Sequence, residues 1–316
     1  MKIVILDGYP VNPGDLSWDA LKEHGELTVY ERTMPDEIIS RAKDAEIVLT
    51  NKVVLTREIL ADLPKLRYIG ILATGTNVVD IAAAHERGII VANVPAYSTY
   101  SVAQLVFALL LGLIYHPDYY TEKNKNGYWS ECADFSYAHH TFIELAGRQL
   151  GIVGFGNIGQ QVARIGAAIG MKIAVETGKP QESLPEGYVK MSREELFATS
   201  DVVTLHCPLC DDTAKMVNAS LIKKMKPTAI LINTARGGLL DENAVAEALR
   251  EGRLAGVGVD VLSTEPPKSD NPLLTAPNIM IMPHIGWATF EARKRLIAVT
   301  AENVEAFLKG TPRNIV

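Results

Sequence analysis

With 316 residues, the chain is too long for one small core and suits two domains of about 150 residues each. Apolar residues make up 47% of it, which indicates a globular protein, and 31 basic against 37 acidic residues give a net charge of -6. This balance provides no basic surface for nucleic acid. The longest apolar run, residues 102–114, falls short of the roughly 20 residues that cross a bilayer, so we expect no membrane partner either.

The cysteines and the N-terminal residues indicate the cellular compartment. The three cysteines, Cys132, Cys207 and Cys210, cannot all pair within one chain, which fits a reducing compartment. Residues 1–10 lack the longer apolar core and cleavage site of a signal peptide, so we expect them to begin a first strand in a cytoplasmic protein. Cys207 and Cys210 have C-x-x-C spacing without a second Cys or His pair, and we predict no metal site.

Residues 1–98 repeat one pattern, an apolar β-rich run, a polar turn and an amphipathic helical stretch. This alternation predicts a parallel sheet covered by helices on both faces. Asp7-Gly8 and Thr74-Gly75 follow two of the runs, at the edge where open α/β sheets bind ligands, so both could contact a substrate. A plain turn explains Asp7-Gly8 equally well. The expected strands are 3–6, 27–30, 47–49, 69–73 and 89–91.

A long apolar helix is expected from Thr99 to Ile114. It is apolar on nearly every side, which predicts burial all round, between two domains or two subunits. The next segment, residues 116–142, is polar and aromatic without clear periodicity. Long ordered loops are usually functional, and we interpret this one as a dimer arm in preference to a lid.

The central motif is G-x-G-x-x-G, formed by Gly154, Gly156 and Gly159. It follows a short apolar run at 150–153 and leads into helical apolar spacing, and a second apolar run follows at 171–175. In this order, strand, turn and helix, the glycines allow a sharp turn, close approach of a pyrophosphate and tight packing of helix on strand. The motif therefore predicts a dinucleotide at a helix N-terminus, where free N–H groups favour phosphate.

Further α/β units follow the glycine motif. Asp241 is a good N-cap for the helix expected at 241–250, and Gly252 is a good stop. A last long helix is expected at 289–309. The expected strands are 202–205, 229–232, 257–259 and 279–282.

Three segments after these strands carry side chains suited to reducing a carbonyl. Arg236 could bind a carboxylate at two points and polarise an adjacent carbonyl, although many such arginines are surface ion pairs. His284 could exchange a proton near neutral pH, and Glu265 could hold its tautomer and stabilise imidazolium. Taken singly, His284 would be interpreted as a structural histidine.

Together these segments resemble the D-isomer-specific 2-hydroxyacid dehydrogenase family. Residues 233–237, 260–266 and 283–286 are similar to its three active-site blocks in order and spacing, and residues 154–159 are similar to its cofactor loop. Thr74-Gly75 resembles the loop whose backbone amides bind the substrate carboxylate. The N-terminal stretch and Trp287-Ala288-Thr289 are similar to the glycerate dehydrogenase or hydroxypyruvate reductase branch.

The resemblance implies a reaction and the residues that carry it. Arg236 would bind the carboxylate and carbonyl oxygen of a 2-oxo acid, His284 would donate the proton while a nicotinamide cofactor delivers hydride, and Glu265 would keep His284 protonated. Substrate contacts are expected from Thr74, Gly75, Arg236 and His284. Asp260 would face the nicotinamide carboxamide. The expected cofactor contacts are Gly154, Gly156, Asn157, Ile158, Gly159, Thr177, Lys179, Cys207, Pro208, Thr234, Ala235, Asp260, His284 and Gly286.

The resemblance also implies the architecture. We expect an α/β fold of two doubly wound parallel-sheet domains, a Rossmann cofactor domain at 99–289 inserted in a flavodoxin-like substrate domain made of 1–98 and 290–316. Substrate would lie in a cleft that closes by hinge motion. Homodimers are usual in this family, and residues 99–145 would form the interface.

The cofactor preference departs from the NAD pattern. The position that usually carries Asp or Glu for the ribose hydroxyls is Thr177, and Lys179 follows it, which would tolerate or attract a 2′-phosphate. Glu176 would point to the other face of a regular strand, although it could reach the ribose if the strand ended earlier. We therefore favour NADP(H), with NAD(H) as the alternative.

We expect an enzyme that reduces hydroxypyruvate or glyoxylate to D-glycerate or glycolate. An activity like that of D-3-phosphoglycerate dehydrogenase is one alternative, but phosphate would require extra basic residues in the cleft. A dinucleotide-sensing corepressor or scaffold is another, and the absence of disordered or strongly charged tails argues against it.

Overall fold

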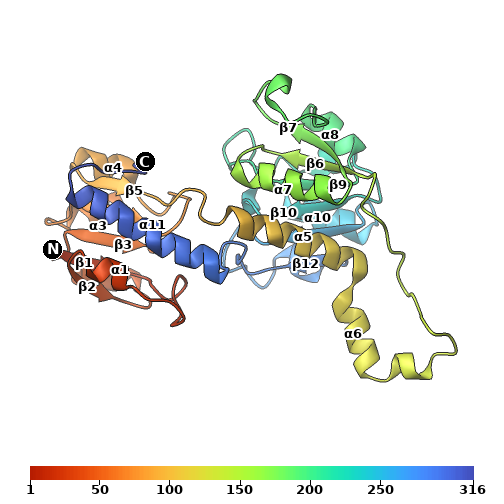
Figure 1. Ribbon diagram of the computed structural model, residues 1–316, viewed down its shortest axis with the longest axis horizontal. Helices are drawn as coiled ribbons and strands as arrows, with labels where there is room; N and C mark the ends of the chain where they lie inside the picture. The colour runs from red at the N-terminus through yellow and green to blue at the C-terminus, as the bar shows by residue number, and fades with distance from the viewer. The chain divides into compact units, whose positions relative to one another are not determined.

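The computed structural model describes residues 1–316, which form two compact units. One unit comprises Met1–Ser98 and Trp287–Val316, and the other comprises Thr99–Gly286. Each unit is an α/β domain built on a single parallel sheet, as the ribbon in Figure 1 shows. Trp287, Ala288 and Thr289 fall in the first unit.

The first unit has a five-stranded parallel sheet in the order β2-β1-β3-β4-β5, which is the order of flavodoxin-like folds. Apolar clusters cover both faces, one beneath α2, α3 and α4 and the other beneath α1 and α11. The strands are β1 (Lys2–Ile5), β2 (Glu26–Val29), β3 (Ile47–Thr50), β4 (Tyr68–Ile71) and β5 (Ile90–Ala92). The helices are α1 (Asp19–Lys22), η1 (Pro35–Glu37), α2 (Ile38–Ala42), α3 (Arg57–Ala61), α4 (Ile81–Glu86) and α11 (Phe290–Leu308).

The second unit has a seven-stranded parallel sheet in the order β12-β11-β10-β9-β6-β7-β8, so the strand order reverses between β9 and β6. This is the doubly wound order of dinucleotide-binding folds. The strands are β6 (Gln149–Val153), β7 (Lys172–Glu176), β8 (Val189–Lys190), β9 (Val202–Leu205), β10 (Ile230–Asn233), β11 (Gly256–Val259) and β12 (Ile279–Ile281).

Helices cover both faces of this second sheet. The apolar cluster on one face includes residues of α5 and α7, and that on the other includes residues of α8, α9 and α10. The helices are α5 (Thr99–Tyr115), α6 (Pro117–Lys125), η2 (Tyr128–Glu131), α7 (Asn157–Ala168), η3 (Gln181–Ser183), α8 (Arg193–Thr199), α9 (Ala219–Ile222), η4 (Gly237–Leu239), α10 (Glu242–Arg250) and η5 (Pro272–Thr275).

The predicted fold class is confirmed, because both sheets are parallel and doubly wound. Every predicted strand is present, with ends displaced by at most two residues. Asp241 caps α10 by accepting a hydrogen bond from the N–H of Ala244, as predicted, and the chain turns at Gly252 with φ 66°. Strand β8, which has two residues and lies at the edge of the sheet, was not predicted.

Helix α5 is buried within its own unit on most sides but has one exposed stripe in the single chain, so its predicted burial between two domains or two subunits stays a prediction. It packs against α7 and strands β10 to β12, yet one stripe of its surface is exposed. Leu111 is 42% exposed and Tyr115, one turn later, is 51% exposed, and Ala108 extends the same stripe.

Residues 116–142 contain a helix that the sequence analysis expected to be loop. Helix α6 begins after His116, which has φ 48°, with Pro117 at its first position. It was missed because none of its residues is buried, so its sequence carries no amphipathic period. Taken singly, no helix here has the length and apolarity to span a membrane. Only α5 and α6 together, bent by 54°, pass that test by length and composition.

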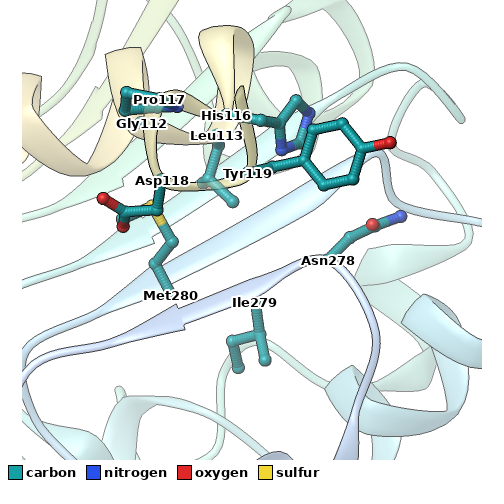
Figure 2. Close-up of a pocket in the computed structure, with 9 residues that line it drawn as sticks. All are labelled: Gly112, Leu113, His116, Pro117, Asp118, Tyr119, Asn278, Ile279 and Met280. Atoms are coloured by element: carbon teal, nitrogen blue, oxygen red, sulfur yellow. The ribbon is translucent and has the colours of Figure 1, made fainter. Parts of the chain in front are cut away.

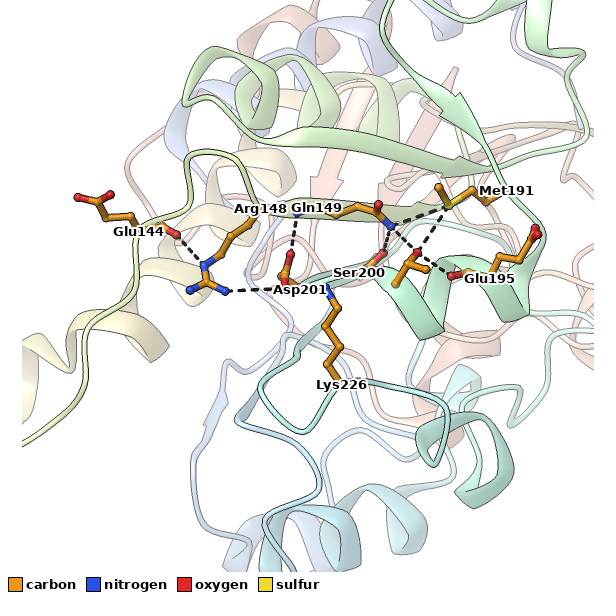
Figure 3. Close-up of polar contacts among 9 residues, drawn as sticks. Glu144, Arg148, Gln149, Met191, Glu195, Ser200, Asp201 and Lys226 are labelled. Atoms are coloured by element: carbon orange, nitrogen blue, oxygen red, sulfur yellow. Dashed lines mark hydrogen bonds and ion pairs between the residues drawn. The ribbon is translucent and has the colours of Figure 1, made fainter.

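At the amino-terminal ends of its central strands, the second sheet is closed by charged side chains (Figure 3). The carboxylate of Asp201, just before β9, accepts hydrogen bonds from the backbone N–H of Gln149 and from the Nζ of Lys226, each at 2.9 Å. The guanidinium of Arg148 lies 3.7 Å from the same carboxylate. These contacts pair the charged groups at the amino-terminal ends of the strands with one another. The candidate ligand-binding residues lie at the opposite, carboxyl edge of the sheet.

Candidate functional site

The three glycines of the motif occupy the turn from β6 to α7 and meet different constraints. Gly154 has φ 94°, and a Cβ there would lie 2.6 Å from the backbone nitrogen of Cys207. A Cβ on Gly159 would lie 2.2 Å from the carbonyl oxygen of Gly154, so α7 packs directly on the turn. A Cβ on Gly156 would meet nothing within 4 Å. Gly156 therefore keeps space open, whereas the other two permit close packing.

The first turn of α7 is open to a ligand. Gly156 is the N-cap residue and has no side chain to accept a hydrogen bond from the turn. The N–H groups of Asn157, Ile158 and Gly159 belong to the first turn and lack i−4 partners in the helix. Phosphate oxygens suit such a turn because they accept hydrogen bonds and carry negative charge. The observed turn thus fits the pyrophosphate of a dinucleotide.

The loop after β9 lies against this turn. Cys207 and Pro208 follow β9, next to β6 in the sheet, and the thiol of Cys207 is half-buried. Burial is the main reason that the pKa of this thiol is raised to about 11. Cys207 is therefore a neutral thiol at physiological pH and is suited to packing rather than to nucleophilic or redox chemistry.

The end of β10 offers a second indication that a ligand belongs here. The hydroxyl of Thr234 is buried and has no hydrogen-bond partner in the protein. Buried hydroxyls without partners are costly and usually serve a ligand or water. The neighbouring Asn233 side chain is satisfied, because it donates to the carbonyl of Arg236 at 2.9 Å and accepts from the N–H of Ala235 at 3.1 Å.

Arg236 stands on a rigid loop between two adjacent strands. Asn233 fixes the backbone on one side of it, and Gly237 fixes the other, because a Cβ on Gly237 would overlap the backbone of Leu262. The guanidinium is exposed, and the one bond found for it goes to the carbonyl of Ala235 at 2.7 Å. It can therefore turn to a carboxylate ligand without breaking an ion pair.

Glu265 and His284 form the pair that the sequence predicted. The Nδ1 of His284 lies 2.6 Å from Oε2 of Glu265, and the other oxygen of Glu265 accepts from the N–H of Leu262 at 3.0 Å. The Nε2 of His284 is left for a ligand. His284 has φ 56°, an uncommon backbone conformation for a non-glycine residue. Such a conformation costs free energy, and residues that adopt it cluster at functional sites.

Asp260 holds the backbone that carries His284. Its two oxygens accept hydrogen bonds from the N–H groups of Ile285 and Gly286, each at 2.8 Å. The carbonyl of Gly286 in turn accepts the hydroxyl of Ser101 on α5. Burial of the Asp260 carboxyl raises its pKa. Asp260 was expected to face a carboxamide, and its role in fixing the histidine loop was not predicted.

Arg236, Asp260 with Glu265, and His284 follow β10, β11 and β12, which are consecutive neighbours in the parallel sheet. Their carboxyl ends therefore lie along one edge, and the close contact of Gly237 with Leu262 joins the first two loops. The Gly154 turn follows β6 on the same edge. This edge can hold a carboxylate, polarise a carbonyl and exchange a proton.

The ribose end of the predicted site lies after β7. The strand stays regular through Glu176, whose side chain turns to the face covered by α8, and Nη2 and Nε of Arg193 lie 2.8 and 3.1 Å from its Oε1. Thr177 comes next, and its hydroxyl accepts from the N–H of Lys179. Of the two directions left open for Glu176, the structure has the one expected for a regular strand, and its contact with Arg193 was not predicted.

Thr74 and Gly75 lie in the first unit, after β4. The hydroxyl of Thr74 donates to the carbonyl of Val94 at 2.8 Å, and its own carbonyl accepts from the side chain of Asn93 at 2.7 Å. These bonds fix the loop. Asp7, the other candidate in this unit, is buried and accepts from three backbone N–H groups at 51–53, which supports the structural interpretation of that turn.

A surface cavity of about 280 Å³ lies elsewhere in the second unit (Figure 2). It is formed where α5 meets α6, with residues Asn278 to Met280 at the start of β12 on its other side. His284 follows the opposite end of the same strand. The cavity therefore contains none of the predicted site residues, and pocket size alone does not locate the site.

Comparison with known proteins agrees with this geometry. Residues 107–286 match the family described as D-isomer specific 2-hydroxyacid dehydrogenase, NAD binding domain. The chain is 46% identical to a hydroxypyruvate reductase of Blautia hydrogenotrophica, over 100% of this chain and 99% of that protein. It is 40% identical to a glycerate dehydrogenase of Methylorubrum extorquens, over 100% of this chain and 98% of that protein.

Solved structures show the same fold with either form of the cofactor. An acyclic imino acid reductase in complex with NADPH and D-Arg superposes with a TM-score of 0.87 at 30% identity, covering 100% of both chains. A D-lactate dehydrogenase of Aquifex aeolicus, in complex with NAD and lactic acid, has a TM-score of 0.83 at 31% identity and covers 98% of this chain and 96% of that one.

Proposed function

Because the chain belongs to the D-isomer-specific 2-hydroxyacid dehydrogenase family, we propose that it reduces hydroxypyruvate to D-glycerate or glyoxylate to glycolate. The observation that carries this proposal is the 2.6 Å pair of Glu265 and His284 on the same sheet edge as Arg236. The names of these two relatives support hydroxypyruvate and glycerate as the reactants. A glyoxylate reductase of Thermococcus litoralis, 40% identical over 87% of this chain and 84% of that protein, supports glyoxylate. The reaction needs a nicotinamide cofactor, which supplies hydride to the carbonyl carbon.

The protein residues divide the remaining work. The guanidinium of Arg236 binds the carboxylate of the 2-oxo acid and donates to its carbonyl oxygen, which favours negative charge developing there. The imidazolium of His284 donates a proton from Nε2 to that oxygen. Glu265 orients the ring and stabilises its charged form through Nδ1. Asp260 holds the histidine loop, and Thr74 and Gly75 are assigned to the substrate carboxylate.

The second unit is proposed as the cofactor domain and the first as the substrate domain. The open first turn of α7 and the partnerless hydroxyl of Thr234 support this assignment, because both belong to the second unit. The proposed cofactor contacts are those of the Gly154 turn, Thr177, Lys179, Cys207, Pro208, Thr234, Ala235 and Gly286. We favour NADP(H), since the carboxylate of Glu176 is already engaged by Arg193.

A substrate panel tests the reaction. Hydroxypyruvate, glyoxylate, pyruvate and 3-phosphohydroxypyruvate are offered with NADPH and with NADH, and oxidation of the cofactor is followed by absorbance. The proposal expects the highest kcat/KM with hydroxypyruvate or glyoxylate. A clear preference for the phosphorylated acid would instead favour D-3-phosphoglycerate dehydrogenase activity. A relative with that name is 37% identical over 92% of this chain.

We also propose a cytoplasmic homodimer. Its interface is assigned to the exposed stripe of α5 and to the aromatic arm that follows, where Trp129 is 52% and Phe135 90% exposed. Light scattering during gel filtration tests it: the native chain should have twice the mass of one chain, and Leu111→Asp should shift it to monomer. A native monomer would refute the assignment.

A further inference from the structure

The contact between Glu176 and Arg193 lies where a nucleotide ribose is expected. Glu176 is the last residue of β7, and Arg193 is the first residue of α8. Two nitrogens of the guanidinium, Nε and Nη2, bind a single oxygen, Oε1, at 3.1 and 2.8 Å. The two side chains are 23% and 33% exposed, so the pair is partly shielded yet reachable from solvent.

The side of the sheet on which the pair lies follows from the alternation of side chains along β7. Ile173 and Val175 pack into the cluster beneath α5 and α7, so Glu176 faces the opposite side, which α8 covers. Cys207, after β9, lies on that side too. The charges of Glu176 and Arg193 both act on its thiol, Glu176 raising and Arg193 lowering its pKa after the main effect of burial. The pair thus lies between the loops that follow β7 and β9.

The contact makes Glu176 a poor acceptor for ribose hydroxyls. An NAD-preferring site needs a carboxylate directed at the 2′- and 3′-hydroxyls, and here the carboxylate is turned to the α8 face and neutralised by a guanidinium. Arg193 still has Nη1 outside the contact. A phosphate dianion accepts hydrogen bonds from guanidinium in a bidentate manner and carries more charge than a carboxylate, so it competes well for Arg193.

Two lysines add to the positive charge near this loop. The Nζ of Lys179 lies 5.5 Å from the ring centre of Phe155, which follows Gly154 in the glycine turn. The Nζ of Lys190 donates to the carbonyl of Lys179 at 2.8 Å and so holds the same loop. No acidic residue lies between Glu176 and Glu182.

We propose that Arg193 determines the cofactor preference of this chain by exchanging its partner, Glu176, for the 2′-phosphate of NADP(H). Without nucleotide, the guanidinium stays on Oε1 of Glu176. With NADP(H) bound, it binds the 2′-phosphate, and Lys179 supplies a second positive charge. NAD(H) offers no such anion, so it leaves the Glu176–Arg193 contact in place. This inference rests on the proposed nucleotide site and names the residue that discriminates at that site.

Equilibrium binding of cofactor fragments tests the exchange without any turnover. Isothermal titration calorimetry is run with 2′,5′-ADP and 5′-ADP on the native protein, on Arg193→Gln and on Glu176→Gln. Arg253→Gln is the matched control, because Arg253 pairs with Glu251 at 2.6 Å on a loop beyond α10. Thermal unfolding of each variant checks that it folds. If Arg193→Gln does not fold, Arg193→Lys replaces it, because lysine keeps the charge but loses the bidentate geometry.

The exchange predicts opposite effects for the two variants. Arg193→Gln should weaken 2′,5′-ADP about tenfold to a hundredfold, because a hydrogen bond to a charged group is lost, and should change 5′-ADP less than about threefold. Glu176→Gln should tighten 2′,5′-ADP a few-fold, since the guanidinium no longer has a competing carboxylate. Arg253→Gln should change neither.

Three results would overturn the inference. The native protein could bind 5′-ADP more tightly than 2′,5′-ADP, Arg193→Gln could weaken both fragments equally, or Glu176→Gln could weaken 2′,5′-ADP. If neither fragment binds the native protein, the nucleotide site and this inference fall together. If the fragments behave as expected but no 2-oxo acid is reduced, the inference stands and the proposed substrate is wrong.

Discussion

The two parallel sheets of this chain differ in how the helices that begin at their carboxyl edges are capped. In the first unit, the carboxylate of Asp7 accepts three backbone N–H groups of the loop after β3, and Thr56 and Asp80 cap helices α3 and α4 with their side chains. In the second, α7 begins at a glycine that caps nothing. Buried side-chain atoms without a partner occur in both units, Oδ1 of Asn51 in the first and the hydroxyl of Thr234 in the second.

An N-terminal turn capped by a side chain has fewer N–H groups to offer a ligand, whereas the uncapped first turn of α7 can bind an anion. The contrast extends within the second unit, because α8, α9 and α10 are capped by Ser192, Asn218 and Asp241. Among these four helices of the second unit, the uncapped one follows the glycine turn.

The largest expected effect is at His284. His284→Ala removes the proposed proton donor, so kcat should fall about a thousandfold, in the range of general acid catalysis. Cofactor affinity should change little, because the glycine turn is untouched. Stopped-flow reduction of hydroxypyruvate and fluorescence titration with cofactor measure the two quantities. A variant that kept half of the native kcat would show that His284 does not donate the proton.

Arg236→Lys should come next, with a loss in kcat/KM of about a hundredfold. Lysine keeps the charge but cannot bind carboxylate and carbonyl oxygen as a planar fork, so both KM and kcat should suffer. Arg250→Lys, an exchange on the surface helix α10, is the control. If Arg236→Lys raised KM alone, Arg236 would hold the substrate without polarising its carbonyl.

The glycine turn gives a prediction with two opposite outcomes. Gly156→Ala should leave the free energy of unfolding nearly unchanged, because its Cβ meets open space, yet weaken cofactor binding about tenfold. Gly154→Ala should instead destabilise the protein by about 1–3 kcal/mol, since φ is 94° and backbone atoms lie 2.6 Å away. Urea unfolding and cofactor titration separate them. If both variants lost the same amount of stability, Gly156 would serve packing, as Gly154 does, and would not keep space open for a ligand.

The smallest expected effects are at two threonines, one from each edge. Thr234→Val replaces a buried hydroxyl without a partner, so stability should stay equal or rise, while cofactor affinity falls a few-fold. Thr50→Val, in the first unit, loses the 2.9 Å bond to the carbonyl of Val53 and should cost about 1 kcal/mol. Thermal unfolding with and without cofactor measures both. A destabilised Thr234→Val would mean that its hydroxyl already has a structural role.

The sequence predicted most strands and the glycine turn at their places along the chain, because apolar runs and glycine spacing are local signals. It also brought Arg236, Glu265 and His284 to neighbouring strand ends, and the structure has them there. Strand β8 and helix α6 were missed, since a two-residue edge strand and a helix without buried residues leave no periodic pattern.

Contacts between segments far apart in the chain could not be predicted from the sequence. The bonds of Asp260 to Ile285 and Gly286 join residues 25 and 26 positions apart, and the Arg193 contact with Glu176 spans 17. A usable signal existed for the second case, because Ser192 and Glu195 form a capping box that places Arg193 at the start of α8. Which side chain Arg193 meets depends on sheet packing.

The most direct test of the account is the product formed from hydroxypyruvate by the native protein and by His284→Ala. Each is incubated with hydroxypyruvate and reduced cofactor, and the glycerate is resolved by chiral chromatography. We predict D-glycerate in an amount equal to the cofactor oxidised by the native protein, and almost none from the variant. L-glycerate, or equal D-glycerate from both proteins, would contradict the proposal that His284 and its neighbours on the second sheet carry out the reduction.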